Sequence, residues 1–413
     1  MKTRNLVSSL AGMALLVASS GAWADGTETL GPPLGITLAD GTGIVAGGTG
    51  LIAQPGLISV DVPAGATVEQ VLLYWEGQMS TDVAGDDTIV IDGNTVTGDL
   101  IGGQTFFFSG AWSSAFRADI TGLGLVFPGP NALTVSGLAF DKANNGAGVV
   151  VIFDDGSDFS DIEIRDGVDL AFINFPIPRK DTIAQTFNFA PSAMARMADL
   201  SMFFSSVSGA TSGGPGGFRP SSVEITVGGT TTLVSDALDS LDGEEWDTLN
   251  LMVPIPAGAN MLTVQAFSRD DNATEYLPAS LAWIAAGLSV PPPQAPEGCT
   301  PGYWKNHTIY KNRNAWVTYT PNQTFNSVFE NAFPGKTLLQ VLKQGGGGLN
   351  ALGRHTVAAL LNAANPDVAY PLTPGQVINK FDSVYPGSKK KYNWLKNKFE
   401  NYNEAGCPNP IQP

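Results

Sequence analysis

Short runs of β-branched and aromatic residues, separated by turns, fill the chain from about residue 30 to residue 290. Residues 71–75 (Val-Leu-Leu-Tyr-Trp) form one such run, and residues 88–96 predict two strands around an Asp-Gly-Asn turn. Residues 148–153 are continuously apolar, as is typical of a central strand, and Asp154-Asp155-Gly156 ends the run. No helical pattern separates these signals. The pattern therefore predicts antiparallel β-sandwich structure.

This β-region also repeats internally. The Asn-x-Leu-Thr-Val segments 131–135 and 260–264 each follow a turn that contains Pro and Gly. We therefore predict tandem antiparallel β-sandwiches, the first over residues 25–175 and the second over 176–290, with a boundary near 169–186. A single larger sandwich is the alternative.

A different pattern begins after residue 290. Four prolines within residues 291–296 predict an extended linker, which we place at 291–298. The remaining chain, 299–413, is predicted to be a small α-helical module, because its apolar positions recur at helical spacing. One helix begins with Thr373 as its N-cap and Pro374 at its first position. The three predicted helices cover residues 356–364, 373–381 and 389–402. The fold class is therefore mainly β.

The first 24 residues have the pattern of a secretory signal peptide. Lys2 and Arg4 are followed by an apolar stretch over residues 10–18 and by Ala22-Trp23-Ala24, which offers small residues at the positions a signal peptidase requires. The apolar stretch is too short to span a bilayer. We expect a secreted, extracellular protein with no transmembrane segment in the mature chain, either soluble or held at a cell surface only by non-covalent contacts.

Composition and charge support this division. Gly contributes 48 of 413 residues, and charged residues make up only 15%, which suits secreted β-sandwiches rich in turns. Residues 25–298 hold 8 Lys and Arg against 33 Asp and Glu, a net charge of −25, whereas 299–413 hold 12 against 5, a net charge of +7. Either two unrelated modules each carry a solvated surface, or the basic tail docks onto the acidic sandwiches or onto an anionic cell-surface polymer.

The only two cysteines, Cys299 and Cys407, enclose almost the whole tail. In an exported protein such a pair predicts one disulfide bond, which would close the helical module.

Little in the sequence points to catalysis. His307 and His355 are the only histidines, and neither a Gly-x-Ser-x-Gly nor a His-Glu-x-x-His motif is present. A glycan hydrolase stays open as an alternative, because carboxylate pairs can assemble in the folded chain. The sequence favours a binding protein over an enzyme.

One acidic loop is a candidate metal site. Four carboxylates fall within eight residues after the strand at 148–153, and clustered carboxylates can supply most of the oxygens that calcium requires. The spacing does not match an Asp-x-Asp-x-Asp-Gly loop, so an ordinary acidic turn is the competing interpretation. The candidate calcium ligands are Asp154, Asp155, Asp158 and Asp161.

The segment Cys-Thr-Pro-Gly-Tyr-Trp-Lys-Asn-His gathers aromatic, amide and imidazole groups beside the predicted disulfide. Aromatic faces with amides can bind sugars or cations, but a small module would equally use its tryptophans as core. The candidate ligand-binding residues are Tyr303, Trp304, Asn306, His307, Trp316 and His355. The two histidines could also share a transition metal.

This string, followed by Trp316 and the Arg-His-x-Val-Ala-Ala-Leu-Leu-Asn-Ala run at 354–363, resembles a module found at the ends of secreted bacterial and archaeal surface proteins. The resemblance covers about residues 298–407. The β-region more loosely resembles adhesin-like sandwich domains. The resemblance implies an extracellular location and supplies no catalytic residues.

Together these features predict a secreted binding or structural protein of a cell surface or biofilm matrix, acting in adhesion. Its partners would be a surface or matrix polymer or other copies of itself, and not nucleic acid. No cofactor is required in this interpretation, and calcium is the one candidate. The alternatives are a carbohydrate-active protein, either a polysaccharide binder or a hydrolase, and a subunit of an extracellular fibre built by strand addition.

Overall fold

The computed structural model describes residues 22–23, 26, 28–108, 110–207, 218–239, 242–293, 295–310, 313–314 and 316–408. The predicted fold class is confirmed: antiparallel sheets dominate, and the α-helices follow near the C-terminus within a region closed by a disulfide. Of the predicted signal peptide, residues 1–21 and Ala24 lie outside the described residues. Its Ala22–Trp23 forms the two-residue strand β1.

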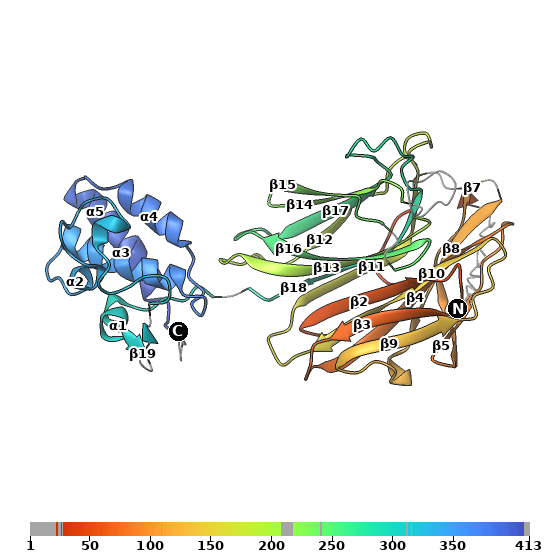
Figure 1. The fold of residues 1–413 in the computed structure, drawn as a ribbon, viewed down its shortest axis with the longest axis horizontal. Helices are drawn as coiled ribbons and strands as arrows, with labels where there is room; N and C mark the ends of the chain where they lie inside the picture. Colours follow the sequence, from red (N-terminus) through yellow and green to blue (C-terminus); the bar gives the residue numbers. More distant parts are fainter. Residues whose placement is uncertain are drawn as a thin grey trace, which may run out of the picture.

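Four sheets form four stacked layers, which we number I to IV from the bottom of the β-region in Figure 1 to its top. Sheet I has the order β3 (Gly56–Val62), β9 (Gly129–Ser136), β5 (Thr88–Ile91), β6 (Asn94–Thr97). Sheet II has the order β1, β7 (Asp99–Phe108), β8 (Ala111–Asp119), β4 (Thr67–Met79), β10 (Ala143–Asp154), β2 (Gly43–Gly50), and a short 3₁₀ turn, η1 (Thr121–Leu123), follows β8.

The other two layers belong to the second half of the β-region. Sheet III has the order β11 (Asp161–Ala171), β18 (Leu281–Val290), β13 (Arg196–Ser205), β16 (Trp246–Ile255). Sheet IV has the order β12 (Gln185–Asn188), β17 (Met261–Phe267), β14 (Ser222–Val227), β15 (Thr230–Ser235). The outer sheets I and IV share one strand order, and the Leu-Thr-Val parts of the two repeated segments lie in their equivalent strands, β9 and β17.

The division between the two halves differs from the predicted boundary. Strand β11 was assigned to the first sandwich, but it pairs with β18 of sheet III. The chain therefore passes from one half to the other within residues 155–160, and not near 169–186. A strand's alternation of apolar and polar residues does not reveal which neighbour it pairs with, so the sequence pattern could not place β11.

The continuous apolar runs have a simple cause, because sheets II and III are buried on both faces. In β4, Leu73 and Trp75 pack in the core between sheets I and II, whereas Leu72 and Tyr74 pack between sheets II and III. A further apolar core lies between sheets III and IV. The two sandwiches thus share a third apolar layer, to which Trp246 of β16 and Phe203 of β13 contribute. We call these four sheets the β-body.

The glycine-rich strand β2 allows close crossing at one edge of the β-body. A Cβ atom at Gly47 would lie 2.1 Å from the carbonyl oxygen of Ser59 in β3, and one at Gly48 would lie 2.2 Å from Nε1 of Trp246. Side chains at these two positions would therefore force β3 and β16 away from β2. The Gly-Gly-Thr-Gly sequence is required by packing and is not a flexible loop.

The helical module has its own core, distinct from those of the β-body. Its elements are α1 (Pro301–Asn306), the short strands β19 (Ile309–Tyr310) and β20 (Arg313–Asn314), η3 (Phe325–Ser327), α2 (Leu338–Leu342), α3 (Leu349–Ala364), α4 (Pro374–Asp382) and α5 (Lys389–Asn403). Thr373 caps α4 as predicted, with Gln376 completing a capping box. Helix α3 begins seven residues before the predicted start, directly after the glycine run 345–348.

The linker connects these two parts at the narrow point in Figure 1. At its start, the Arg196 guanidinium of β13 donates to the carbonyl oxygen of Pro291. At its end, Glu297 and Ala369 are joined by two hydrogen bonds, one from the Glu297 backbone N–H and one to its carboxylate. Across the described residues, none of the helices combines the length and apolar character needed to span a bilayer.

Candidate functional site

The Cys-Thr-Pro-Gly-Tyr-Trp-Lys-Asn-His segment begins with a well-capped helix. Thr300 accepts a hydrogen bond at its hydroxyl from the backbone N–H of Tyr303 (3.1 Å), and Pro301 occupies the first helical position. Just before it, Cys299 is bonded to Cys407, as predicted. The disulfide and the N-cap together fix the position at which the linker ends and α1 begins.

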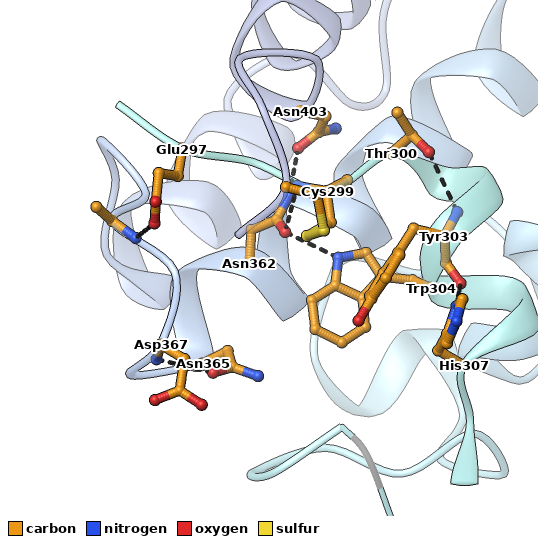
Figure 2. The surroundings of a disulfide bond; sticks show 12 residues. Glu297, Cys299, Thr300, Tyr303, Trp304, His307, Asn362, Asn365, Asp367 and Asn403 are labelled. Atoms are coloured by element: carbon orange, nitrogen blue, oxygen red, sulfur yellow. Dashed lines mark hydrogen bonds between the residues drawn. A yellow bond between two sulfur atoms is a disulfide. The ribbon is translucent and has the colours of Figure 1, made fainter. Parts of the chain in front are cut away.

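A single buried amide organises the surroundings of this disulfide (Figure 2). The Asn362 side-chain oxygen accepts from the Cys299 backbone N–H (2.9 Å) and from Trp304 Nε1 (2.8 Å). Its nitrogen donates to the Cys299 carbonyl and to Asn403 Oδ1, both at 2.9 Å. Asn403 in turn donates to the His355 carbonyl. Because buried polar groups are costly without partners, this Asn362 hub locks three segments of the module together.

The six candidate ligand residues divide between core and surface. Trp304 and Trp316 are each 1% exposed and belong to the module core. At the surface, the His307 ring stacks on the Tyr303 ring with centroids 4.1 Å apart, and Asn306 is exposed beside them. Figure 2 shows Tyr303 and His307 on the same side of α1. The segment therefore combines a structural part with a small exposed aromatic stack.

His355 does not join this surface. It is buried on α3, where its Nε2 atom lies 3.6 Å from the Glu400 carboxylate of α5. Burial lowers the pKa of His355 to about 4, although Glu400 acts in the opposite direction. Its neighbours thus differ from those of His307, which stacks on Tyr303. Within the described residues, no group of three or more His, Cys, Asp or Glu is placed to hold a metal ion.

The acidic loop after β10 is a chain of local turns. Asp154 accepts from the Gly156 backbone N–H (2.8 Å), and Asp155 accepts from both the backbone and the hydroxyl of Ser157. These bonds lower the pKa of Asp155. Asp161 begins β11, and Asp158 is exposed in the loop between them. Among the described residues, these four carboxylates do not form a group that could hold a metal ion. Calcium binding at this loop therefore stays a prediction.

Sequence reasoning missed a polar cluster between the two sandwiches. Glu76 of β4 is fully buried and accepts hydrogen bonds from Ser113 (2.5 Å), Ser205 (2.6 Å) and Asn145 (2.7 Å). Burial raises its pKa. Because Ser205 belongs to β13 of sheet III, this carboxyl group ties sheet II to sheet III. Its burial gives it a structural role, and no pattern along the chain predicts it.

Two further acids are buried in the β-body, Asp166 on the face of sheet III that meets sheet II and Asp169 on the other face of sheet III. Asp166 of β11 forms a buried ion pair with Arg117 of β8 (2.5 Å), and the Tyr74 hydroxyl donates to the same carboxylate. Asp169 is 3% exposed and accepts from the Ile183 backbone N–H (2.7 Å), and burial raises its pKa to about 8. Glu76, Asp166 and Asp169 therefore each have hydrogen-bond partners inside the β-body.

A second feature that the sequence analysis did not single out lies on α5. Its outer face carries Trp394, which is 62% exposed, among lysines one turn away on either side. The sequence signal that indicates it is the spacing of Lys390, Lys391, Trp394 and Lys398, which places the four side chains on successive turns of one helix.

The β-body also presents an open edge at its second sandwich. Strand β15 is one of the two edge strands of sheet IV and carries no charged residue. Beside it lies an apolar groove of about 240 Å³, lined by β14, β15 and β16 and including Val227, Val234 and Met252. Met252 is 65% exposed. Natural edge strands are commonly protected by lysine or proline, and β15 is not.

No family model matches the sequence, and no curated protein matches it either. PNGF-II aligns at 11% identity over 58% of this chain and 59% of its own, with a TM-score of 0.24. PNGase F, a glycosylasparaginase from Flavobacterium meningosepticum, aligns at 11% identity over 57% and 89%, with a TM-score of 0.23. An exo-β-1,3-galactanase from Phanerochaete chrysosporium aligns at 10% identity over 57% and 56%, with a TM-score of 0.19. The chain spans 59% of the length of PNGF-II.

Proposed function

We propose that this protein is exported and acts outside the cell as a binding protein of a cell surface or matrix, in which the helical module contacts the partner. One observation carries the proposal. The module has its own core and disulfide, bears a net charge of +7, and is joined by a short linker to a β-body region of net charge −25. This division suits a protein in which the β-body acts as a scaffold and the helical module binds the partner.

The disulfide supports the export part of the proposal. Disulfide bonds persist in oxidising compartments outside the cytoplasm, and the Cys299–Cys407 bond accompanies the signal-peptide pattern of residues 1–24. Binding is favoured over catalysis because the buried carboxyl groups Glu76, Asp166 and Asp169 are taken up by hydrogen bonds and ion pairing within the β-body. A buried acid of this kind does not reach a polymer at the surface.

Fractionation of the producing cells tests the proposal. We expect the intact chain in the cell-surface or matrix fraction, and a chain ending at residue 298 in the medium, because it lacks the helical module. A cytoplasmic location of the intact chain would contradict export. Release of the intact chain into the medium, to the same extent as the shortened one, would contradict retention by the module.

The uncharged edge of β15 favours a second candidate function, that of a fibre subunit built by strand addition. Leu233 is 45% exposed on this edge strand. If fibres form, Leu233→Lys should abolish the filaments seen by negative-stain microscopy, because a lysine on an edge strand opposes pairing with a second chain. A strictly monomeric protein at high concentration would contradict this function.

A further inference from the structure

Helix α5 presents a basic face centred on one tryptophan. Residues three and four apart are neighbours on a helix surface. Trp394 therefore lies beside Lys390 and Lys391 in one direction and beside Lys398 in the other, with the Lys398 ammonium 6.0 Å from the centre of the indole ring. Lys390 and Lys391 are exposed, as is Trp394. We call these four residues the Trp394 face.

This face is separate from the contacts that hold the helix in place. Leu395 and Phe399 are fully buried in the module core, on a side of the helix turned by about 100–140° from Trp394. Lys396 points elsewhere, because its ammonium pairs with the Glu400 carboxylate at 2.7 Å. The Trp394 face is therefore not needed to cover the core, and packing within the module does not explain a large aromatic side chain there.

We propose that the Trp394 face binds an acidic polysaccharide, with a sugar ring stacked on the indole and the polymer's carboxylate or sulfate groups paired with the lysines. This inference rests on the proposed function and names the partner of the same module. Aromatic rings present a negative face that attracts the C–H groups of a sugar ring. Three ammonium groups around the ring add long-range attraction for a polyanion.

The composition of the face favours a carbohydrate over other anionic partners. Three exposed asparagines, Asn393, Asn397 and Asn401, lie on the outer side of α5 and can both donate to and accept from sugar hydroxyls. Nucleic-acid phosphates are preferentially bound by arginine, and α5 contains none. A bilayer surface requires a broad apolar area, whereas Trp394 is the only exposed large apolar side chain among the described residues of α5.

The test measures binding of the full-length, disulfide-bonded protein to polygalacturonate by isothermal titration calorimetry, with dextran as the neutral polymer. We expect Trp394→Ala, and separately the triple change Lys390→Gln, Lys391→Gln and Lys398→Gln, each to weaken binding about tenfold or more. The matched control removes the same charge elsewhere in the module, at Lys305, Lys343 and Lys380. It should weaken binding by less than about threefold.

Each other outcome overturns the inference. Equal loss in the control triple would mean general attraction to the basic module without a defined face. Equal binding of dextran would exclude selection for charge. Tighter binding of the unaltered protein to duplex DNA or to vesicles rich in anionic lipid would assign the face to those partners, and loss of self-association in the face variants would assign it to the acidic β-body of a second copy.

The retention assay separates this inference from the function on which it rests. If the unaltered protein is retained at the surface or matrix and the Trp394→Ala variant is retained equally, the inference fails while the proposed function stands. If the unaltered protein is not retained, the proposed function itself fails. Circular dichroism of both variants should match that of the unaltered protein, because the altered side chains lie outside the core.

Discussion

The β-body and the helical module are stabilised in different ways. The β-body stacks four sheets, so that three apolar cores form and the inner sheets II and III are buried on both faces. The module has one core and depends in addition on a disulfide and on the Asn362 hub. The contrast follows from size, since a small domain buries a smaller fraction of its surface and relies more on covalent closure.

The two parts also bury titratable groups of opposite kind. The β-body buries carboxyl groups whose pKa values burial raises, Glu76 and Asp169 among them. The module buries His355, whose pKa burial lowers. Both groups are therefore favoured in their neutral forms, and the two parts should lose stability at opposite ends of the pH range.

The largest expected effect is that of breaking the disulfide. The bond closes a loop with a sequence separation of 108 residues, and the chain-entropy model assigns such a loop about 4–5 kcal/mol. In the variant Cys299→Ser/Cys407→Ser, scanning calorimetry should show the module's transition at a much lower temperature and the β-body's transition unchanged. A single transition that shifts as a whole would show that the two parts unfold together.

The next effect is the pH dependence of the β-body. The pKa of Asp169 is about 8 in the folded protein and near 3.9 in an unfolded chain. The folded state therefore holds this proton over the interval in which the unfolded state has lost it. The free energy of unfolding should fall by about 3.5 kcal/mol between pH 5 and pH 8. Urea unfolding at the two pH values measures it, and Asp169→Asn should remove most of the difference. An unchanged slope in this variant would contradict the assignment.

A smaller effect is expected from the Asn362 hub. Asn362→Ala leaves the Trp304 indole N–H and the Cys299 backbone groups without their buried partner, which should cost about 2–3 kcal/mol. Thermal melts should show the loss in the module's transition alone. Asn397→Ala, on the exposed side of α5, serves as control and should change stability by less than about 0.5 kcal/mol.

The smallest effect concerns His355 and has the opposite sign to that of Asp169. Because its pKa is about 4 in the folded module and near 6.5 when unfolded, the unfolded state gains a proton first as the pH falls. The free energy of unfolding of the module should fall by about 2 kcal/mol between pH 7 and pH 5. His355→Gln should flatten this dependence. A module whose stability rose on acidification would show that Glu400, 3.6 Å away, dominates over burial.

Local patterns in the sequence predicted the strands, the N-cap of α4 and the disulfide. Thr373 with Pro374 marked the start of α4, and the isolated pair Cys299 and Cys407 marked the bond. These features depend on neighbouring residues or on a single pairing. The stacking of sheet II on sheet III depends on contacts between distant strands, and therefore had no signature beyond the unbroken apolar run at 148–153.

The candidate site was predicted less well for the same reason. The composition of the segment from Tyr303 to His307 made it a candidate site, but composition alone could not show that Trp304 turns inward to Asn362 while His307 stacks outward. The partner of Trp304 lies 58 residues away in sequence. The Trp394 face, in contrast, follows from local spacing along α5, because its three lysines are three or four positions from Trp394.

The double burial of sheet II has a consequence for how this protein is made. A ribosome delivers the first half of the β-body before the second, so the face of sheet II that carries Leu72, Tyr74, Val150 and Ile152 is complete while its cover is still missing. That cover closes only when β18, the last strand of sheet III, has emerged. Until then this apolar face of sheet II is exposed to solvent in the nascent chain. Its biogenesis should therefore depend on a chaperone that shields this surface during synthesis.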